Sequence, residues 1–234
     1  MFAGLVPLLA AALAGAAPDI HVEPALLEIP ADQEAAEVWV SNPGDRPWAA
    51  QASLYDWSQR IDGEQLAPTG TLIPSPARFT IPAGGRQRLR LVRTRPAPGG
   101  ETAFRLILDQ QADPQTPGAT RLRHSSAVFI SPAVPQAPPH LRVETRGDTT
   151  HPALVLHNAG GIHARITELA WIDPQGHRHL LQPGLAGYVL AGTTRRWPLP
   201  AHASGYAGGR FEAQINQGRP QTLETATLAA IPAH

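Results

Sequence analysis

The chain has 234 residues, of which 42% are hydrophobic and 16% charged, a balance typical of a folded protein rather than a disordered one. Its formal net charge is zero and it contains no cysteine. These two facts exclude disulfides, cysteine-ligated metal centres, a thiol nucleophile and a global field that attracts nucleic acid or anionic lipid. All 19 basic residues are arginine, so any cationic site must use a guanidinium group.

The N-terminus has the pattern of a secretory signal peptide. Residues 5–14 form an apolar run that is too short to span a bilayer. Ala14, Gly15 and Ala16 follow it and fit an A-x-A cleavage site. Only the α-amine of Met1 carries positive charge before the run, which leaves a buried N-terminal helix as the alternative. We therefore predict that residues 1–16 are removed and that the protein is exported.

Short strands follow along the chain. The 25 prolines and 21 glycines leave no room for long helices, because proline removes an amide donor and clashes with the preceding turn. Runs with period-two alternation predict strands at residues 37–40, 50–55 and 102–109. Between residues 86 and 95, arginines alternate with leucines. This run lacks interleaved aromatic residues, which favours a solvated sheet face with one or two ion pairs over a nucleic-acid site.

A proline-rich segment divides the chain. Four prolines lie within residues 131–139, which predicts a stiff extended connection. Strand-like runs resume beyond it, at residues 141–143, 153–158, 164–172, 187–190, 195–200 and 211–215. The sequence thus predicts an all-β protein with a first domain at 17–133, a linker at 134–139 and a second domain at 140–234. Each domain is the size of one β-sandwich.

Two groups of histidine-containing residues are candidates for a metal or catalytic site. His177 and His179 could place two imidazoles on one strand face, but the turn signal Pro-Gln-Gly at residues 174–176 favours a solvated hairpin. A metal-dependent enzyme using this pair stays open as the minor alternative. His124 precedes Ser125 and Ser126, yet no G-x-S-x-G elbow surrounds them and adjacent strand residues point to opposite faces. We expect no enzymatic activity, cofactor or small-molecule substrate.

A set of motifs in the first half occurs in a characteristic order. These are SNPGDRP at residues 41–47, YDW at 55–57, PSP at 74–76, IPAGG at 81–85 and GETAFRL at 100–106. The ordered set resembles the first domain of the periplasmic chaperones that assemble pili by the chaperone–usher route. In the second half, Asn158, GYVLAG at 187–192 and RRWPL at 195–199 are similar to the archaic branch of these chaperones.

The resemblance implies a fold and a function. The fold is two immunoglobulin-like β-sandwich domains set at an angle. The function is to bind a pilin-like subunit in the periplasm by β-strand addition and to deliver it to an outer-membrane usher for pilus assembly. The chaperone lends the last strand of its first domain to a bare hydrophobic groove of the subunit, which would otherwise aggregate. Neither nucleic acid nor a cofactor takes part.

The resemblance places the donor strand at residues 118–130. Upstream of residue 121 the side chains are small or polar, Thr120 among them, so Leu122 is the one large residue that fits a groove. In the family two basic residues hold the carboxylate at the subunit's C-terminus, and the matching positions here are Leu26 and Ser125, which are not basic. Arg123, two residues before Ser125 and on the same strand face, fits that role. The alternative is that Arg123 is a solvated edge charge.

The resemblance also implies an ion pair between domains. Arg90 and Glu101 match a buried pair that in the family helps to fix the domain angle. The acidic partner expected from the second domain falls near Gln217, whose side chain supplies at most a hydrogen bond. These departures keep a second hypothesis open, a secreted two-domain immunoglobulin-like adaptor or structural protein without strand donation.

Overall fold

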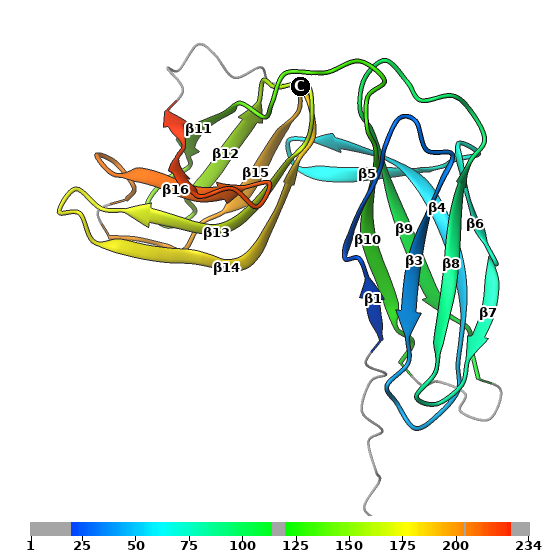
Figure 1. The fold of residues 1–234 in the computed structure, drawn as a ribbon. Coiled ribbons are helices and arrows are strands. Elements are labelled where there is room, and N and C mark those ends of the chain that lie inside the picture. The colour runs from blue at the N-terminus through cyan, green and yellow to red at the C-terminus, as the bar shows by residue number, and fades with distance from the viewer. Residues whose placement is uncertain (1–19, 114–119, 204, 226–234) are drawn as a thin grey trace, which may run out of the picture.

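Two β-sandwiches set at an angle make up the protein (Figure 1). The computed structural model describes residues 20–113, 120–203 and 205–225, and within these residues every regular element is a strand. The predicted fold class is therefore confirmed. None of the described segments is a helix of the length and apolarity needed to cross a membrane. The predicted signal peptide lies outside the described residues.

The first sandwich contains ten strands in two sheets. One sheet has the order β1-β3-β8-β6, formed by β1 (His21–Glu23), β3 (Ala35–Ser41), β8 (Arg86–Arg93) and β6 (Leu72–Ser75). The other has the order β2-β10-β9-β4-β5, formed by β2 (Leu26–Ile29), β10 (Arg123–Ile130), β9 (Thr102–Gln110), β4 (Trp48–Arg60) and β5 (Gly63–Pro68); β7 (Arg78–Ile81) also pairs with β4.

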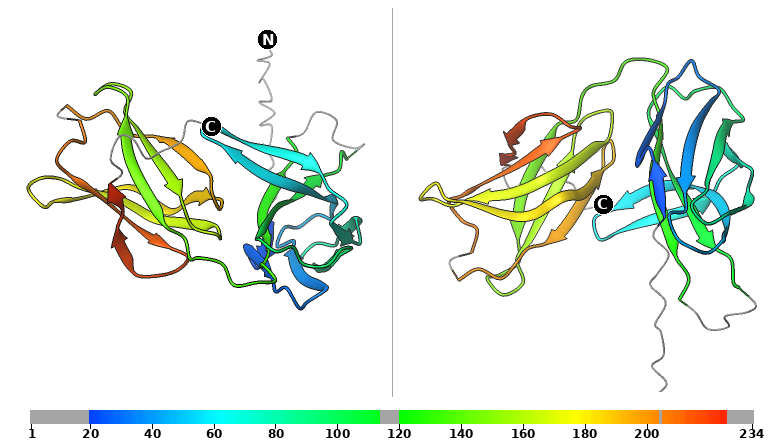
Figure 2. Two further views of the ribbon diagram at one scale, coloured as in Figure 1. Left: turned by 90° about the horizontal axis from the view of Figure 1, so that it is seen from above. Right: turned by 60° about the horizontal axis from the view of Figure 1, so that its bottom comes forward.

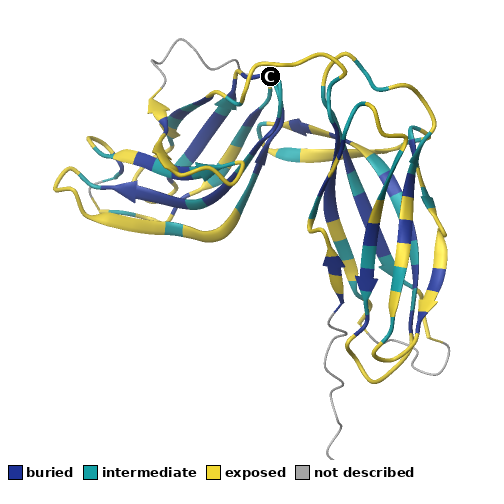
Figure 3. Ribbon diagram, in the orientation of Figure 1, coloured by how far each residue is buried: buried dark blue, intermediate teal, exposed yellow. Residues whose placement is uncertain are grey.

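Alternation along the strands builds the core of this sandwich. Leu89 and Leu91 on β8 are fully buried, and they meet Leu106 and Leu108 from β9 of the opposite sheet. The residues between them face solvent, which gives β3 and β8 their alternating bands of buried and exposed residues (Figure 3). The predicted arrangement of leucines on one face and arginines on the other is thus confirmed.

The second sandwich contains eight strands in two sheets of four. The first sheet has the order β15-β12-β11-β18, formed by β11 (Leu141–Arg146), β12 (Ala153–Asn158), β15 (Thr194–Pro198) and β18 (Glu224–Thr225). The second has the order β14-β13-β16-β17, formed by β13 (Ala164–Ile172), β14 (Arg178–Val189), β16 (Arg210–Ile215) and β17 (Pro220–Thr222). Residues 131–140, which include the proline-rich segment, connect β10 to β11.

A long hairpin joins the two sandwiches. Strands β4 and β5 extend from the first sandwich to the second (Figures 1 and 2). At the tip of the hairpin, the backbone N–H of Arg196 donates to the carbonyl of Ile61 at 2.9 Å. The guanidinium group of Arg196 also lies 2.7 Å from the Asp62 carboxylate. The hairpin thereby fixes β15 of the second sandwich to the first.

Candidate protein-binding edge

One strand of the first sandwich is only partly covered. Strand β10 pairs with β9 along its whole length, from Arg123 opposite Asp109 to Ile130 opposite Thr102. On its other side β2 pairs with it only from Ala127 to Ile130. The reason is that the N-terminal chain changes sheets: β1 pairs with β3, and only β2 joins β10. Within the described structure, residues 123–126 therefore have an open strand edge.

The backbone groups on the open side can be identified from the pairing with β9. The Leu122 carbonyl accepts a hydrogen bond from the Gln110 N–H at 3.0 Å, so Leu122 faces β9. Backbone groups alternate in direction along an antiparallel strand, so the N–H and C=O groups of Arg123 and Ser125 point to the open side. A row of such groups is a template for pairing with another strand.

The side chains along this edge differ from the prediction. Leu122 is half-buried and packs against the core of the first sandwich, on the same side as Val128 and Ile130. It is therefore not a protruding apolar residue. The side chains that face outward at the open edge are those of Arg121, Arg123 and Ser125, all exposed. The backbone of Thr120 precedes β10 and its side chain is also exposed.

Arg123 makes a weak ion pair in the free protein. Its Nε lies 3.4 Å from Oδ1 of Asp109, and the two side chains are 60% and 43% exposed. Exposed pairs of this kind contribute about 0–1 kcal/mol, so Arg123 can exchange Asp109 for another carboxylate at little cost. Ser125 is exposed and lies two residues from Ala127, the partner of Leu26. The structure thus brings Leu26 and Ser125 close together, and neither supplies a charge.

Arg105 is a basic residue beside the domain interface that the sequence interpretation missed. It lies opposite Ala127 on β9, in the same cross-strand row as Leu26. Its guanidinium group stacks 3.7 Å above the ring centre of Trp57 and binds both carboxylate oxygens of Glu64 at 3.0 and 3.1 Å. The signal was present in the sequence, since Arg105 stands between two core residues in the GETAFRL motif.

Aromatic residues from both sandwiches pack together in a buried cluster beside Arg105. Trp57 and Phe129 from the first sandwich contact Tyr188 from the second, with ring centres 5.6 and 5.9 Å from that of Tyr188. Burial raises the pKa of Tyr188, and the nearby guanidinium groups of Arg165 and Arg105 oppose this shift. Two arginines therefore lie near the buried tyrosine at the domain interface.

The predicted interdomain ion pair has a different partner. The carboxylate of Glu101 accepts a hydrogen bond from the His163 N–H at 2.7 Å and lies 2.8 Å from His163 Nδ1. Both side chains are nearly buried, at 8% and 3% exposed. Arg90 instead lies on the exposed face of β8, in the other sheet, and the described residues show no ion pair between it and Glu101. The interpretation of Arg90 as the partner is corrected to His163.

His163 is fixed from three sides. Its ring stacks on Phe129 of β10, with ring centres 3.6 Å apart and planes at 6°. Its carbonyl accepts a hydrogen bond from Nδ2 of Asn216 at 3.0 Å. His163 thus makes the contact to Glu101 that the sequence assigned to Gln217, while Asn216, the neighbour of Gln217, holds His163 within the second sandwich. His163 stands alone between a glycine turn and a strand, and no motif identified it.

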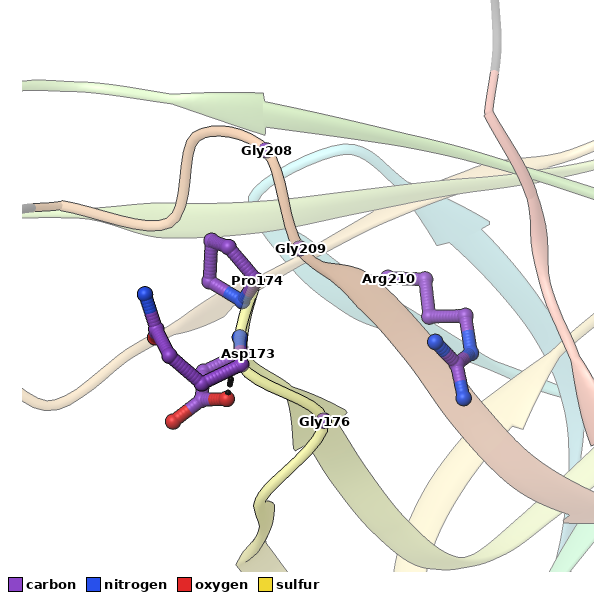
Figure 4. A pocket seen from close by; sticks show the side chains of 7 residues that line it. Asp173, Pro174, Gly176, Gly208, Gly209 and Arg210 are labelled. Atoms are coloured by element: carbon purple, nitrogen blue, oxygen red, sulfur yellow. Dashed lines mark hydrogen bonds between the residues drawn. The ribbon is translucent and has the colours of Figure 1, made fainter.

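The two histidines of the β13–β14 hairpin share one carboxylate. His177 Nδ1 and His179 Nε2 lie 3.1 and 3.0 Å from Oδ2 of Asp173, whose pKa these contacts, led by that of His179, hold well below its ordinary value. Asp173 also lines a shallow pocket with the turn at residues 174–176, Gly208 and Gly209. Arg210 lines the same pocket from the opposite side (Figure 4). Among the described residues no group of three or more potential ligands suits a metal ion.

His124 contacts Ser126 rather than Ser125. The His124 Nε2 and Ser126 Oγ atoms are 2.9 Å apart, as expected for residues two apart on one strand face. Burial lowers the pKa of His124. The contact lies on the face of β10 that packs on the first sandwich, beneath the open edge.

Comparison with known proteins gives a consistent result. Residues 19–134 match the family model described as pili and flagellar-assembly chaperone, PapD N-terminal domain. The curated proteins contain no match to the chain. Among solved structures, one match is a chain of the CsuC–CsuE chaperone–tip adhesion subunit pre-assembly complex from the archaic Csu pili of Acinetobacter baumannii. It is 21% identical with a TM-score of 0.69, covering 89% of this chain and 100% of that one.

Two further structures show the same fold. A chain of the Salmonella enterica SafA pilin–SafB chaperone complex is 17% identical with a TM-score of 0.62, covering 90% of this chain and 98% of that one. The CupB2 chaperone of Pseudomonas aeruginosa is 15% identical with a TM-score of 0.55, covering 86% and 97%. At these identities the likeness establishes the two-sandwich architecture over nearly the whole length of each structure.

Proposed function

This chain belongs through its first domain to the pili and flagellar-assembly chaperone family, and we propose that it holds a pilin-like subunit by lending it the open edge of β10. The observation that carries the proposal is the backbone of residues 123–126, which no strand of the described structure covers on the side away from β9. Similar structures are of a chaperone bound to a tip adhesion subunit and of a pilin bound to its chaperone. The protein acts in the periplasm after export, without enzymatic activity, and passes its subunit to an usher.

Strand addition here is mainly a backbone interaction. A strand of the subunit that pairs with residues 123–126 joins this sheet beside β10, in line with β2, and satisfies the outward N–H and C=O groups of Arg123 and Ser125. Leu122, which packs inward, supports the edge from behind. Thr120, Arg123 and Ser125 supply the side-chain contacts at the surface. Binding also covers an edge on the subunit that is otherwise prone to aggregate.

Two arginines are candidates for holding the subunit's C-terminal carboxylate, and we assign this role to Arg105. It lies in the row of Leu26 and Ala127 beside the domain interface, where Trp57 and Glu64 fix its orientation. A second carboxylate can use the N–H groups of the guanidinium fork that Glu64 leaves free. Arg123, more exposed and nearer the start of β10, contacts the subunit along the edge instead.

Removal of each arginine separates the two roles. We expect Arg105→Gln to weaken subunit capture by about tenfold or more and Arg123→Gln by only a few-fold, because a charge-assisted bidentate bond is worth about 1.5–3 kcal/mol. Binding constants should be measured with the native subunit and with a subunit whose terminal carboxylate is amidated. Amidation should weaken binding to the wild type and leave Arg105→Gln unaffected. If Arg123→Gln is the variant insensitive to amidation, the anchor is Arg123.

The function itself is tested by isolating the protein from the periplasm of its native host during pilus expression and identifying co-purifying proteins by mass spectrometry. We expect a small β-rich protein in one-to-one ratio that aggregates once it is separated from the chaperone. A protein that emerges alone and monomeric, while the pilin genes are expressed, contradicts strand donation and supports the adaptor alternative.

A further inference from the structure

The sheet opposite the candidate site presents a row of three arginines. Arg86, Arg88 and Arg90 alternate on β8 with residues that point into the sandwich, among them the fully buried Leu89 and Leu91. All three guanidinium groups therefore lie on the outer face of the sheet β1-β3-β8-β6, and we call this set the arginine row. Alternate residues of a strand are about 7 Å apart, so the row places positive charges at a regular spacing.

A tryptophan orients the first arginine of the row. Trp39 on the neighbouring strand β3 lies on the same face, and the guanidinium carbon of Arg86 stands 3.8 Å above its ring centre. The guanidinium carbon of Arg88 is 6.0 Å from the same ring. Stacking occupies the flat face of a guanidinium group and leaves its N–H groups, which point outward in the plane, free to donate. Arg86 is thus held in place by its stacking on Trp39, and no carboxylate among the described residues pairs with its hydrogen-bonding edge.

The positive charge of the row is only partly neutralised. Arg88 pairs with Glu37 at 3.3 Å, and both side chains are about half exposed. In the described part of the chain, Arg86 and Arg90 have no carboxylate within the 4.0 Å of an ion pair. Glu37 lies directly opposite Arg90, and the exposed Glu23 of β1 lies opposite Trp39 on the same face. Three arginines against these two carboxylates leave one net positive charge on this face of a chain that is neutral as a whole.

We propose that the arginine row binds an extended acidic segment of another polypeptide, with carboxylates on alternate residues. Side chains on one face of an extended segment recur about every 7 Å, the same spacing as the row, and carboxylates fit the guanidinium forks of Arg86 and Arg90. Nucleic acid is a poorer fit, because its bases need aromatic platforms and the nearest one, Trp39, is already covered by Arg86.

This surface is distinct from the edge used for strand addition. The row belongs to the sheet β1-β3-β8-β6, whereas β10 belongs to the other sheet of the sandwich. An acidic partner can therefore occupy the row while a subunit occupies β10. In an assembly pathway, such a second contact suits a protein that receives the loaded chaperone.

The test uses the full chain and a labelled peptide of twelve residues with alternating Thr and Glu, compared with a peptide of alternating Thr and Gln. Fluorescence anisotropy should show binding of the Glu peptide only, weakening as salt is raised. The double variant Arg86→Glu/Arg90→Glu should bind it at least about tenfold more weakly, because two attractive contacts become repulsive. The matched control is Arg78→Glu/Arg219→Glu, which makes the same charge change at two exposed arginines and should bind like the wild type.

Three results would overturn the proposal. One is equal binding of the Glu peptide to the wild type and to Arg86→Glu/Arg90→Glu. Another is an equal loss in the control variant, which indicates a response to net charge alone. The third is tighter binding of a twelve-nucleotide single strand of thymidines, lost in the same variant, which assigns the row to nucleic acid. Subunit capture, measured in parallel, should be unchanged in Arg86→Glu/Arg90→Glu. This second measurement distinguishes a failure of the arginine-row proposal from a failure of the strand-donation proposal.

Discussion

Single buried asparagines fix the same kind of loop in both sandwiches. Asn42 donates from Nδ2 to the carbonyls of Arg46 and Ile81 at 2.7 and 3.2 Å, while Asn158 donates to those of Ile162 and Val189 at 2.8 and 3.1 Å. Each closes its own loop and ties it to a distant strand. These two residues stood in the motifs that carried the resemblance, because a buried amide with this many partners cannot be replaced without leaving polar groups unsatisfied.

The contribution of the Asp173 carboxylate, at the β13–β14 turn, to the stability of the fold depends on pH. The pKa of Asp173 lies well below its ordinary value of 3.8, chiefly through the hydrogen bond with His179. A carboxyl group whose pKa is lower in the folded state stabilises the fold above its unfolded pKa, and this contribution is lost as pH falls below about 4. We expect Asp173→Asn to lower the melting temperature at pH 7, and the difference from the wild type to shrink progressively below pH 4.

Thermal unfolding of both proteins between pH 7 and pH 2 checks this prediction. Asp56→Asn is the control, since Asp56 is exposed and has no ion pair with another described residue. An offset between Asp173→Asn and the wild type that stays constant across this range would contradict the role of the carboxylate charge.

At the scale of elements, alternation in the sequence identified the strands but not which of their edges stay open. The alternation of leucines and arginines in β8 shows which side chains face the core and which face solvent. The position of Pro132 shows where β10 ends. The open edge arises because β1 and β2 join different sheets, a long-range pairing that no local pattern encodes. The direction of Leu122, by contrast, follows from alternation, since Leu122 shares its face with the buried Val128 and Ile130.

The corrected position of Leu122 leads to a prediction about stability. Because Leu122 is half-buried against the core, we expect Leu122→Ala to reduce the free energy of unfolding by about 1–2 kcal/mol. Urea unfolding followed by tryptophan fluorescence measures this change. Leu66→Ala, at an exposed leucine of β5, is the control and should be close to neutral. An unchanged stability in Leu122→Ala would mean that Leu122 protrudes from the edge, as the sequence suggested.

At the scale of the whole molecule, the domain interface combines motif residues such as Trp57 and Tyr188 with isolated polar residues that carry no sequence signal. Gln59 is buried, donates to the Tyr188 carbonyl at 3.0 Å and accepts from the Leu190 N–H at 2.9 Å. It lies 129 residues from Tyr188 in the chain. Two sandwiches and a proline-rich connection were predictable from the composition and from the period-two alternation of hydrophobic residues. Isolated polar residues such as Gln59 and His163 were not, because only the folded arrangement makes them partners.

His163 offers a direct test of how the domains are held together. His163→Ala removes the donor that faces the nearly buried Glu101 carboxylate and the ring stacked on Phe129. We expect a loss of about 2–4 kcal/mol and, in calorimetry, a separation of one unfolding transition into two as the domains uncouple. His151→Ala, at a histidine that is 89% exposed, should leave the transition unchanged. A single transition at the wild-type temperature in His163→Ala would contradict the interface role.

The most direct test of strand addition is to remove one backbone donor from the open edge. Ser125→Pro deletes the outward N–H while the bonds to β9, made by the neighbouring residues, remain; Ser125→Ala removes only the hydroxyl group. Both variants should be purified, checked for thermal unfolding and tested for capture of the subunit identified from the periplasm. We predict that Ser125→Ala captures the subunit like the wild type and that a folded Ser125→Pro does not. Equal capture by a folded Ser125→Pro would contradict the central claim that the backbone of β10 holds the subunit.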